Sequence, residues 1–260
     1  MKKIQTAQIA FIAIFLIVIL IYISKPFDDK FYIVGNSLVI ALSLMATLSG
    51  IYAYRIYGYG SIQGKSLLFL TFGLFFWFLG ETTWGIYEIA TGIESPLVSI
   101  ADIFWILGYP FFLLGIYFIC KMAALPLGRK NKYFLTFILF LSILLCSYLI
   151  YPTLISQELI FLEKLTLAFY VVFDCILLFA TIFAIIYLKN TKFLKVWILV
   201  FLALFLATVA DIYYMNLAEM YQTGNLIDIL WDLDYLIMSF GLFYMREKTK
   251  EIFSTEVKRK

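Results

Sequence analysis

Eight long apolar runs divide this chain, and they constrain its fold more than any other feature. Each run has a length near the ~20 residues that a helix needs to cross the hydrocarbon core of a bilayer. Glycine, proline and charged residues separate the runs. We therefore expect an all-α integral membrane protein, an eight-helix transmembrane bundle that makes multiple passes through the cell membrane. The predicted spans are residues 7–24, 31–54, 66–89, 98–120, 133–151, 164–188, 195–218 and 226–245.

The composition excludes several classes of protein. Only 14% of the residues are charged, against about a quarter in an ordinary globular domain, so lipid is the expected solvent and the bilayer the expected partner. Eight spans occupy most of the 260 residues, which leaves no room for a soluble catalytic or nucleic-acid-binding domain. The chain has no histidine, which excludes His-ligated metal sites and His general bases. We expect no nucleic acid partner and no cofactor, and the sequence leaves the binding of a metal ion open.

The basic residues predict how the bundle is oriented. If the N-terminus is cytoplasmic, all but three of the 20 basic residues fall on the cytoplasmic side, and only Lys25, Lys30 and Lys164 lie outside. Basic residues favour cytoplasmic connections, so both termini are predicted to be cytoplasmic, with a tail over 247–260. The first run starts like a secretory signal but has no A-x-A cleavage site before Lys25, so we expect a retained anchor.

An internal repeat divides the predicted spans into two groups of four. The motif D-x-x-W-x-x-x-Y begins at Asp102 and again at Asp228, and each copy opens the last helix of its half. One helix earlier, Glu81 and Asp211 each lie sixteen residues after a lysine. Because each half has an even number of spans, both halves enter the membrane in the same direction, which makes the repeats parallel. We place repeat one at about 1–122 and repeat two at about 131–246.

Carboxylic acids lie inside the predicted spans, where they are costly. An ionised Asp at the centre of a lipid-facing helix costs about 2.5 to 3.5 kcal/mol, so we expect the acids to face the bundle interior. Helix direction places several of them at the same depth, in the outer leaflet. Lys164 is the one basic residue near that layer and is a candidate salt-bridge partner. The acids are Glu81, Asp102, Asp174, Asp211, Asp228, Asp232 and Asp234.

Aromatic residues share helix faces with these acids. Steps of three and four residues place the acids, the tryptophan and the tyrosine of each motif copy on one stripe. Such a lining suits a small cationic or polyhydroxylated ligand, through charge pairing and cation–π contact. The alternative is structural, with the acids hydrogen-bonding across helices. The candidate ligand-binding residues are Glu81, Trp84, Asp102, Trp105, Tyr109, Asp174, Asp211, Asp228, Trp231, Asp232 and Tyr235.

Several short motifs carry a family resemblance. After Glu81-Thr-Thr-Trp84, residues 99–110 read S-I-A-D-I-F-W-I-L-G-Y-P, and the later part has A-D-I-Y-Y, Y-Q-T-G and D-I-L-W. With these motifs, residues 31–245 resemble the membrane sensor regions found before diguanylate cyclase (GGDEF) and histidine kinase modules, which carry P-S-x-A-D-x-x-Y-L-x-G-Y-P. Trp105 stands where that pattern usually has Tyr, and the proline before Ser99 is displaced to Pro96.

The resemblance implies a membrane domain that senses a ligand. The chain continues for only about fifteen residues after the last predicted span, so we expect no effector domain and an output through a protein partner, at the cytoplasmic side or in the membrane. A secondary transporter or cation-coupled carrier is an alternative, favoured by repeats and intramembrane acids. A structural membrane subunit of a complex is another. An enzyme is disfavoured and no catalytic residue is predicted, because Asp234 lacks the G-x-G-D context of presenilin-type proteases.

Overall fold

The computed structural model describes residues 2–27, 30–123, 128–217 and 220–257, and this part of the chain forms eight α-helices. The predicted all-α class and all eight predicted helices are confirmed. Residue 218 of the seventh predicted span and residues 258–260 of the predicted tail lie outside the described residues. The helices are α1 (Lys2–Ser24), α2 (Phe31–Tyr54), α3 (Ile62–Thr91), α4 (Ile100–Ala123), α5 (Arg129–Ile155), α6 (Phe161–Leu188), α7 (Leu194–Leu217) and α8 (Asp228–Val257).

Seven of the helices described, α1 to α7, are long and apolar enough to cross a membrane. The eighth helix, α8, is not among these seven. Its first two turns hold the charged residues Asp228, Asp232 and Asp234. All three of these side chains are buried in the bundle, so α8 presents its charge to protein rather than to lipid. By length and composition the fold is therefore that of a helical bundle suited to multiple membrane passes.

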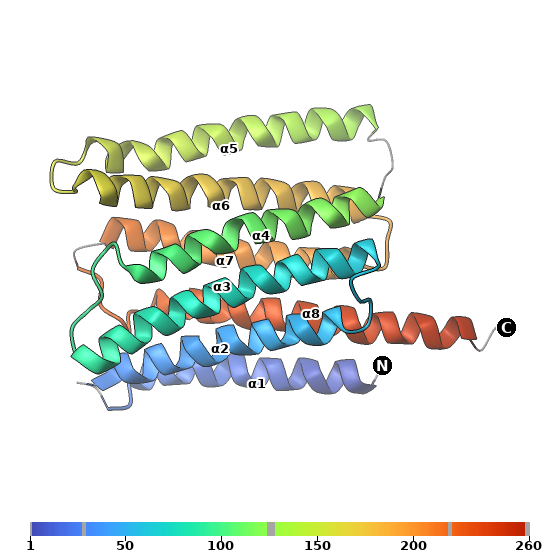
Figure 1. Ribbon diagram of the computed structural model, residues 1–260, viewed down its shortest axis with the longest axis horizontal. Helices are drawn as coiled ribbons and strands as arrows, with labels where there is room; N and C mark the ends of the chain where they lie inside the picture. Colours follow the sequence, from blue (N-terminus) through green and yellow to red (C-terminus); the bar gives the residue numbers. More distant parts are fainter. Residues whose placement is uncertain (1, 28–29, 124–127, 218–219, 258–260) are drawn as a thin grey trace.

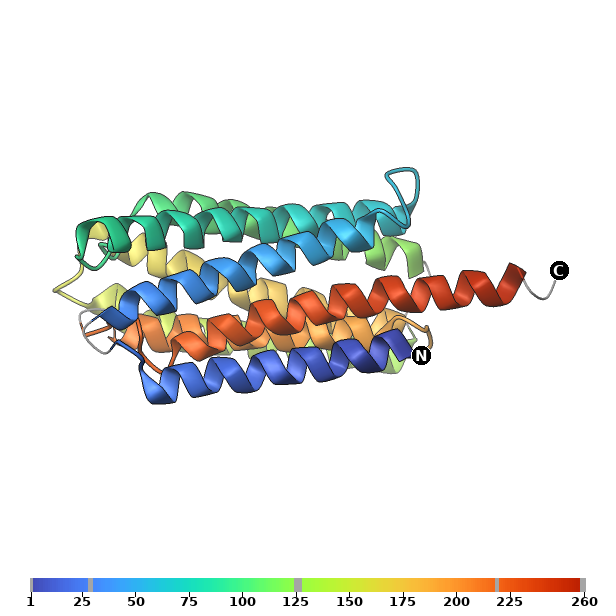
Figure 2. The same cartoon turned by 90° about the horizontal axis from the view of Figure 1, so that it is seen from below.

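Six of the helices form a closed ring. In order around the ring, α2 packs on α3, α3 on α4, α4 on α6, α6 on α7, α7 on α8 and α8 back on α2. The other two lie outside, α1 against α8 and α5 against α6 (Figure 1). All eight run along one axis, and the start of α1 and the end of α8 lie at the same end of the bundle (Figure 2).

The predicted tail begins inside a helix. α8 continues without a break to Val257, so residues 247–257 extend the last span and project beyond the other helices (Figures 1 and 2). Two contacts fasten the start of this extension. The Thr249 and Tyr57 hydroxyls are hydrogen-bonded at 2.5 Å, and the Arg246 guanidinium lies 3.4 Å from the centre of the Tyr52 ring.

Close packing of α3 on α4 depends on two reciprocal glycine–tryptophan contacts. The Trp105 indole covers Gly80, and the Trp77 indole covers Gly108. A methyl group added to Gly80 would lie 2.5 Å from Trp105, and one added to Gly108 would lie 2.4 Å from Trp77. Both indoles sit beside the interior of the ring, so these glycines also determine where the two rings can lie.

We expect Gly80→Ala and Gly108→Ala each to destabilise the bundle. Forcing a methyl group into a filled space costs about 1 to 3 kcal/mol, which exceeds the ~1 kcal/mol that alanine gains over glycine in a helix. Thermal unfolding of the purified chain in detergent measures the loss. Gly60→Ala is the control, because a methyl group there meets nothing within 4 Å. Equal unfolding temperatures for all three variants would contradict this packing.

Candidate functional site

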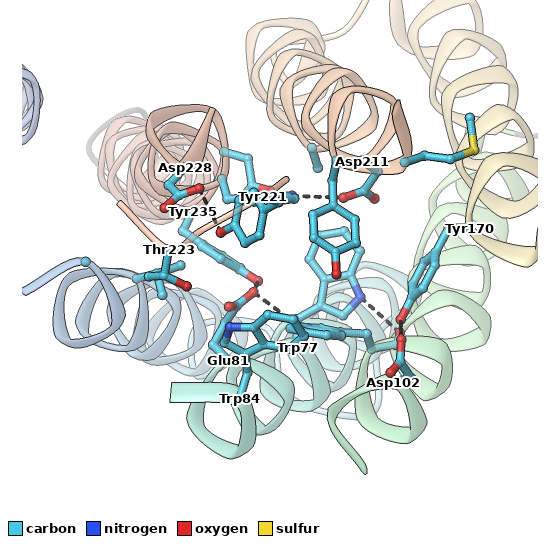
Figure 3. A pocket seen from close by; sticks show the side chains of 18 of the residues that line it. Trp77, Glu81, Trp84, Asp102, Tyr170, Asp211, Tyr221, Thr223, Asp228 and Tyr235 are labelled. Atoms are coloured by element: carbon cyan, nitrogen blue, oxygen red, sulfur yellow. Dashed lines mark hydrogen bonds between the residues drawn. The ribbon is translucent and has the colours of Figure 1, made fainter. Parts of the chain in front are cut away.

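A cavity of about 120 Å³ lies inside the ring. Side chains from α2, α3, α4, α6, α7 and α8 surround it, together with Tyr22 of α1 (Figure 3). Leu97, Tyr221 and Thr223 come from the α3–α4 and α7–α8 connections, so the cavity lies towards the end of the bundle opposite the termini. Its volume is close to that of an engineered cavity of ~150 Å³ that binds benzene, which limits a ligand to a small molecule or a few waters.

The cavity brings together nine of the eleven predicted ligand-binding residues. Asp174 and Asp232 are not part of the lining, which differs from the sequence prediction for both. Asp234 lines the cavity in place of Asp232. The nine residues are Glu81, Trp84, Asp102, Trp105, Tyr109, Asp211, Asp228, Trp231 and Tyr235.

In each motif copy, the aspartate caps the start of its own helix. The Asp102 carboxylate accepts a hydrogen bond from the Ser99 backbone N–H at 2.7 Å and another from the Tyr170 hydroxyl at 2.7 Å. The Asp228 carboxylate accepts from the Gly224 backbone N–H at 2.7 Å and from the Tyr221 hydroxyl at 2.9 Å. Each side chain satisfies a backbone amide of the connection that leads into its own helix, and an acid in the first helical turn is also favoured by the helix dipole. Both oxygens of each aspartate are therefore occupied.

The tryptophan of each motif copy donates to the acid on the preceding helix. Trp105 Nε1 donates to Glu81 Oε1 at 3.2 Å, and Trp231 Nε1 donates to Asp211 Oδ1 at 2.9 Å. In both cases an indole that packs as an apolar side chain also supplies a hydrogen-bond donor to a carboxylate in the interior. The two copies thus share one local geometry, although Glu81 and Asp211 differ in side-chain length.

The tyrosine of each motif copy reaches across the ring. Tyr235 of α8 donates to Glu81 Oε1 of α3 at 2.8 Å, and Tyr109 of α4 donates to Asp174 Oδ1 of α6 at 2.7 Å. Asp174 lies behind Tyr109 and within hydrogen-bonding reach of Asp211. These bonds join helices far apart in sequence and close the ring around the cavity.

Glu88 is an important residue that the sequence prediction missed. Its side chain is buried and accepts from Asn36 Nδ2 at 2.6 Å, from the Thr223 hydroxyl at 2.7 Å and from the Ser95 backbone N–H at 3.2 Å. It therefore links α3 to α2, to the α3–α4 connection and to the α7–α8 connection. Glu88 lies one residue from the end of its predicted span, where acids are common. Glu88 follows Glu81 by seven residues, or two helical turns, which places both on one face of the helix. This spacing could have identified Glu88 from the sequence.

Three acids have buried carboxylate oxygens without a hydrogen-bond partner among the described residues: one oxygen each of Asp174 and Asp234, and both oxygens of Asp232. Asp174 and Asp232 are not part of the lining, although Asp232 lies beside the lining residue Tyr22 of α1. Asp234 lines the cavity with a side chain that is only 3% exposed, so the cavity is where a partner for it could bind.

Lys164 forms no salt bridge with an acid among the residues that the structure describes, in contrast to the sequence prediction. Its ammonium group donates to the backbone carbonyl of Leu154 at 3.3 Å, in an exposed position. Of the described residues that line the cavity, none is Lys or Arg. Nor do the described residues include a group of three or more Cys, Asp or Glu side chains placed to hold a metal ion. The lining therefore supplies carboxylate oxygens and aromatic faces. The five acids in it are Glu81, Asp102, Asp211, Asp228 and Asp234.

Comparisons with known proteins do not assign the chain to a family. No family model matches it, and no curated protein or solved structure is significantly similar to it. The resemblance to membrane sensor regions therefore stays a prediction. The functional inference depends on the cavity.

We expect Glu88→Ala to loosen this end of the bundle. The change leaves the buried Asn36 amide and Thr223 hydroxyl without their acceptor, at a cost of about 1 to 3 kcal/mol for each unsatisfied group. The unfolding temperature in detergent should fall, and the α7–α8 connection should become more sensitive to protease. Glu158→Gln is the control, since Glu158 is exposed in the α5–α6 connection. An unchanged protease pattern in Glu88→Ala would be the contrary result.

Glu94, in the α3–α4 connection, predicts a pH effect. Partial burial and the charge of Glu88 raise the pKa of Glu94 to about 7 from 4.5. A carboxyl group with a raised pKa stabilises the fold below pH 4.5 and loses that contribution as the pH rises through about 7. Because the side chain is exposed and screened, we expect Glu94→Gln to raise the unfolding temperature by only about 1 to 3 °C at pH 8. At pH 4, below the pKa of the unfolded chain, the same comparison should show almost no difference, and an equal shift at both pH values would exclude this cause.

Proposed function

We propose that the chain is a membrane sensor of the receptor type, located in the cell membrane, which binds a small ligand or cation in the cavity and signals through a protein partner. The observation that carries this proposal is a cavity lined by acids and aromatic rings, with a buried carboxylate oxygen of Asp234 that has no partner among the described residues. A buried carboxylate without a partner is costly. A ligand that supplies the missing partner would bind there and stabilise one packing of the bundle.

We also propose that the bundle is built from two parallel four-helix repeats. Exchanging α2 with α6, α3 with α7 and α4 with α8 returns the ring to the same order of contacts. The tryptophan hydrogen bonds of the two motif copies correspond in the same way, whereas the tyrosine bonds differ in the helix they reach. The outer helices differ, since α1 packs on α8 whereas α5 packs on α6. A ring of equivalent helices around one axis would place the ligand between the two halves.

The termini are proposed to be cytoplasmic and the cavity to open to the outside. Basic residues gather at the end of the bundle that holds both termini, as cytoplasmic segments do. The cavity lies towards the other end. A ligand from outside the cell would then reach Asp228 and Asp234 at the outer end of α8, while residues 247–257 of the same helix offer a contact to a partner or to anionic lipid inside.

A secondary transporter or carrier is the second candidate. The intramembrane acids and the correspondence of the two halves favour it. Transporter sites of this kind are commonly formed by helices that break at the middle of the membrane, whereas each of the six ring helices described is continuous. A structural subunit of a complex is the remaining alternative. It requires the acids to act only as links between helices.

The test is retention of a small molecule by the cavity. The purified chain in lipid nanodiscs is dialysed against the low-molecular-weight fraction of an extract of its own cells and their medium, and retained compounds are identified by mass spectrometry. We expect one compound to be enriched, and Glu81→Gln or Asp211→Asn to reduce the enrichment about tenfold or more, because each removes a charged acceptor worth about 1.5 to 3 kcal/mol. Glu158→Gln should retain it.

Two results would argue against the sensor. If Glu81→Gln and Asp211→Asn both unfold the chain in detergent and no compound is enriched by the unaltered chain, the acids are structural. If the enriched compound accumulates inside sealed proteoliposomes, the chain is a carrier. Retention without transport supports the proposed function.

A further inference from the structure

The unpaired acceptors of the cavity restrict which ligands it can bind. Glu81 uses one oxygen, Oε1, for its hydrogen bonds from Trp105 and from Tyr235, and its Oε2 accepts no hydrogen bond from the described residues. Asp234 Oδ2 is buried and lacks a partner in the described part of the chain. Glu81 and Asp211 are the main charged neighbours of Asp234. The free hydrogen-bonding capacity at this point is therefore that of carboxylate oxygens.

Six side-chain donors of the wall are already committed to acids. Trp105 and Trp231 each give their indole N–H to a carboxylate, and Tyr109, Tyr170, Tyr221 and Tyr235 each give their hydroxyl to one. A ligand that needs these donors, such as an anion, would have to break these bonds. A polyhydroxylated ligand needs donors and acceptors together and is matched less well than a ligand that only donates.

Aromatic rings make up much of the rest of the wall. The Trp77 ring lies edge-on to the rings of Tyr109 and Tyr235, with centres 5.8 and 6.3 Å away. Nearer the end of the bundle, the Trp84 ring is 5.7 Å from that of Trp105 and 6.4 Å from that of Tyr214. Rings that surround an enclosed space around a negative charge provide the environment in which proteins bind alkylated ammonium groups.

We propose that the cavity binds a small organic ammonium ion, with Asp234 and Glu81 pairing its charge and Trp84 among the rings that enclose its alkyl groups (Figure 3). The inference rests on the proposed ligand-binding function and narrows it to one chemical class. The acids supply acceptors for an N–H donor, and the rings supply cation–π contact to the methyl groups. A cavity of about 120 Å³ has room for on the order of four to seven non-hydrogen atoms, the size of trimethylammonium to a short hydroxyalkyl analogue.

The experiment titrates the full chain in nanodiscs with trimethylammonium chloride. Sodium chloride at equal ionic strength and erythritol serve as comparison ligands. Four of the five tryptophans line the cavity, so their fluorescence reports binding at this place, and calorimetry gives the dissociation constant. We expect a saturable fluorescence change with trimethylammonium, and affinity at least about tenfold higher than for either comparison ligand.

Variants separate binding in the cavity from binding elsewhere. Asp234→Asn should weaken trimethylammonium binding about tenfold or more, since it replaces the charged acceptor by a neutral amide. Trp84→Leu should weaken it by about the same factor, whereas Trp84→Phe should stay within about threefold because a ring remains. Glu158→Gln is the control and should bind as the unaltered chain does. If Asp234→Asn fails to fold, the comparison of Trp84→Leu with Trp84→Phe decides whether trimethylammonium binds in the cavity.

Each outcome bears on one proposal. If erythritol or sodium binds in the cavity and trimethylammonium does not, the ammonium class is wrong while the cavity remains a ligand site. If none of the three binds, the ammonium proposal is again overturned, and the dialysis experiment with Glu81→Gln and Asp211→Asn still decides the proposed function. Trimethylammonium binding that is unaffected by Asp234→Asn and Trp84→Leu would place the ligand outside the cavity and also overturn the inference.

Discussion

The structure depends on how carboxylates are accommodated in the interior of a bundle built for hydrocarbon. An unpaired charge there costs several kcal/mol, more than most single packing contacts return. The chain meets this cost with hydrogen-bond donors carried on large apolar side chains. Tryptophan and tyrosine fill space between helices as apolar groups do, and their N–H and O–H groups reach the acids. The bonds from Trp105 and Tyr235 to Glu81 show both effects at one residue. The acids thereby become the points at which the ring of six helices is joined.

The acids fall into two groups, according to whether the described residues pair both of their carboxylate oxygens. Asp102, Asp228 and Glu88 have both carboxylate oxygens hydrogen-bonded within the bundle, and their contacts explain them as structural links. Asp234 and Glu81 keep unbonded oxygens beside the cavity. These two acceptors do not serve as fully paired links between the described helices, and under the proposed function they are available to a ligand. The proposed ligand site is therefore a small part of a larger polar network that also holds the helices together.

Helix α8 connects the proposed ligand site with the opposite end of the molecule. Asp228 and Asp234 lie at its start beside the cavity, and Arg246 and Thr249 contact α2 and the connection after it. A continuous helix transmits a rotation or shift along its length more directly than a broken one. The same continuity of the ring helices distinguishes the chain from transporters that bind substrate at a helix break. A receptor that reports to a partner at the projecting end of α8 is the function that this geometry favours.

The sequence by itself determined the eight helices and most of the acids that line the cavity. Hydropathy sets the length of each span, and residues three and four apart share a helix face, so the two copies of the D-x-x-W-x-x-x-Y motif supplied six of the nine lining residues that were predicted. The other three lie on the preceding helices and are Glu81, Trp84 and Asp211. Only the tertiary structure decided that Asp234 faces the cavity and Asp232 faces Tyr22, and that Tyr235 and Glu81 meet across the ring. The reason is physical. Periodicity tells which residues share a face, whereas the rotation of a helix about its axis, and the partner it meets, depend on packing against helices far away in the sequence.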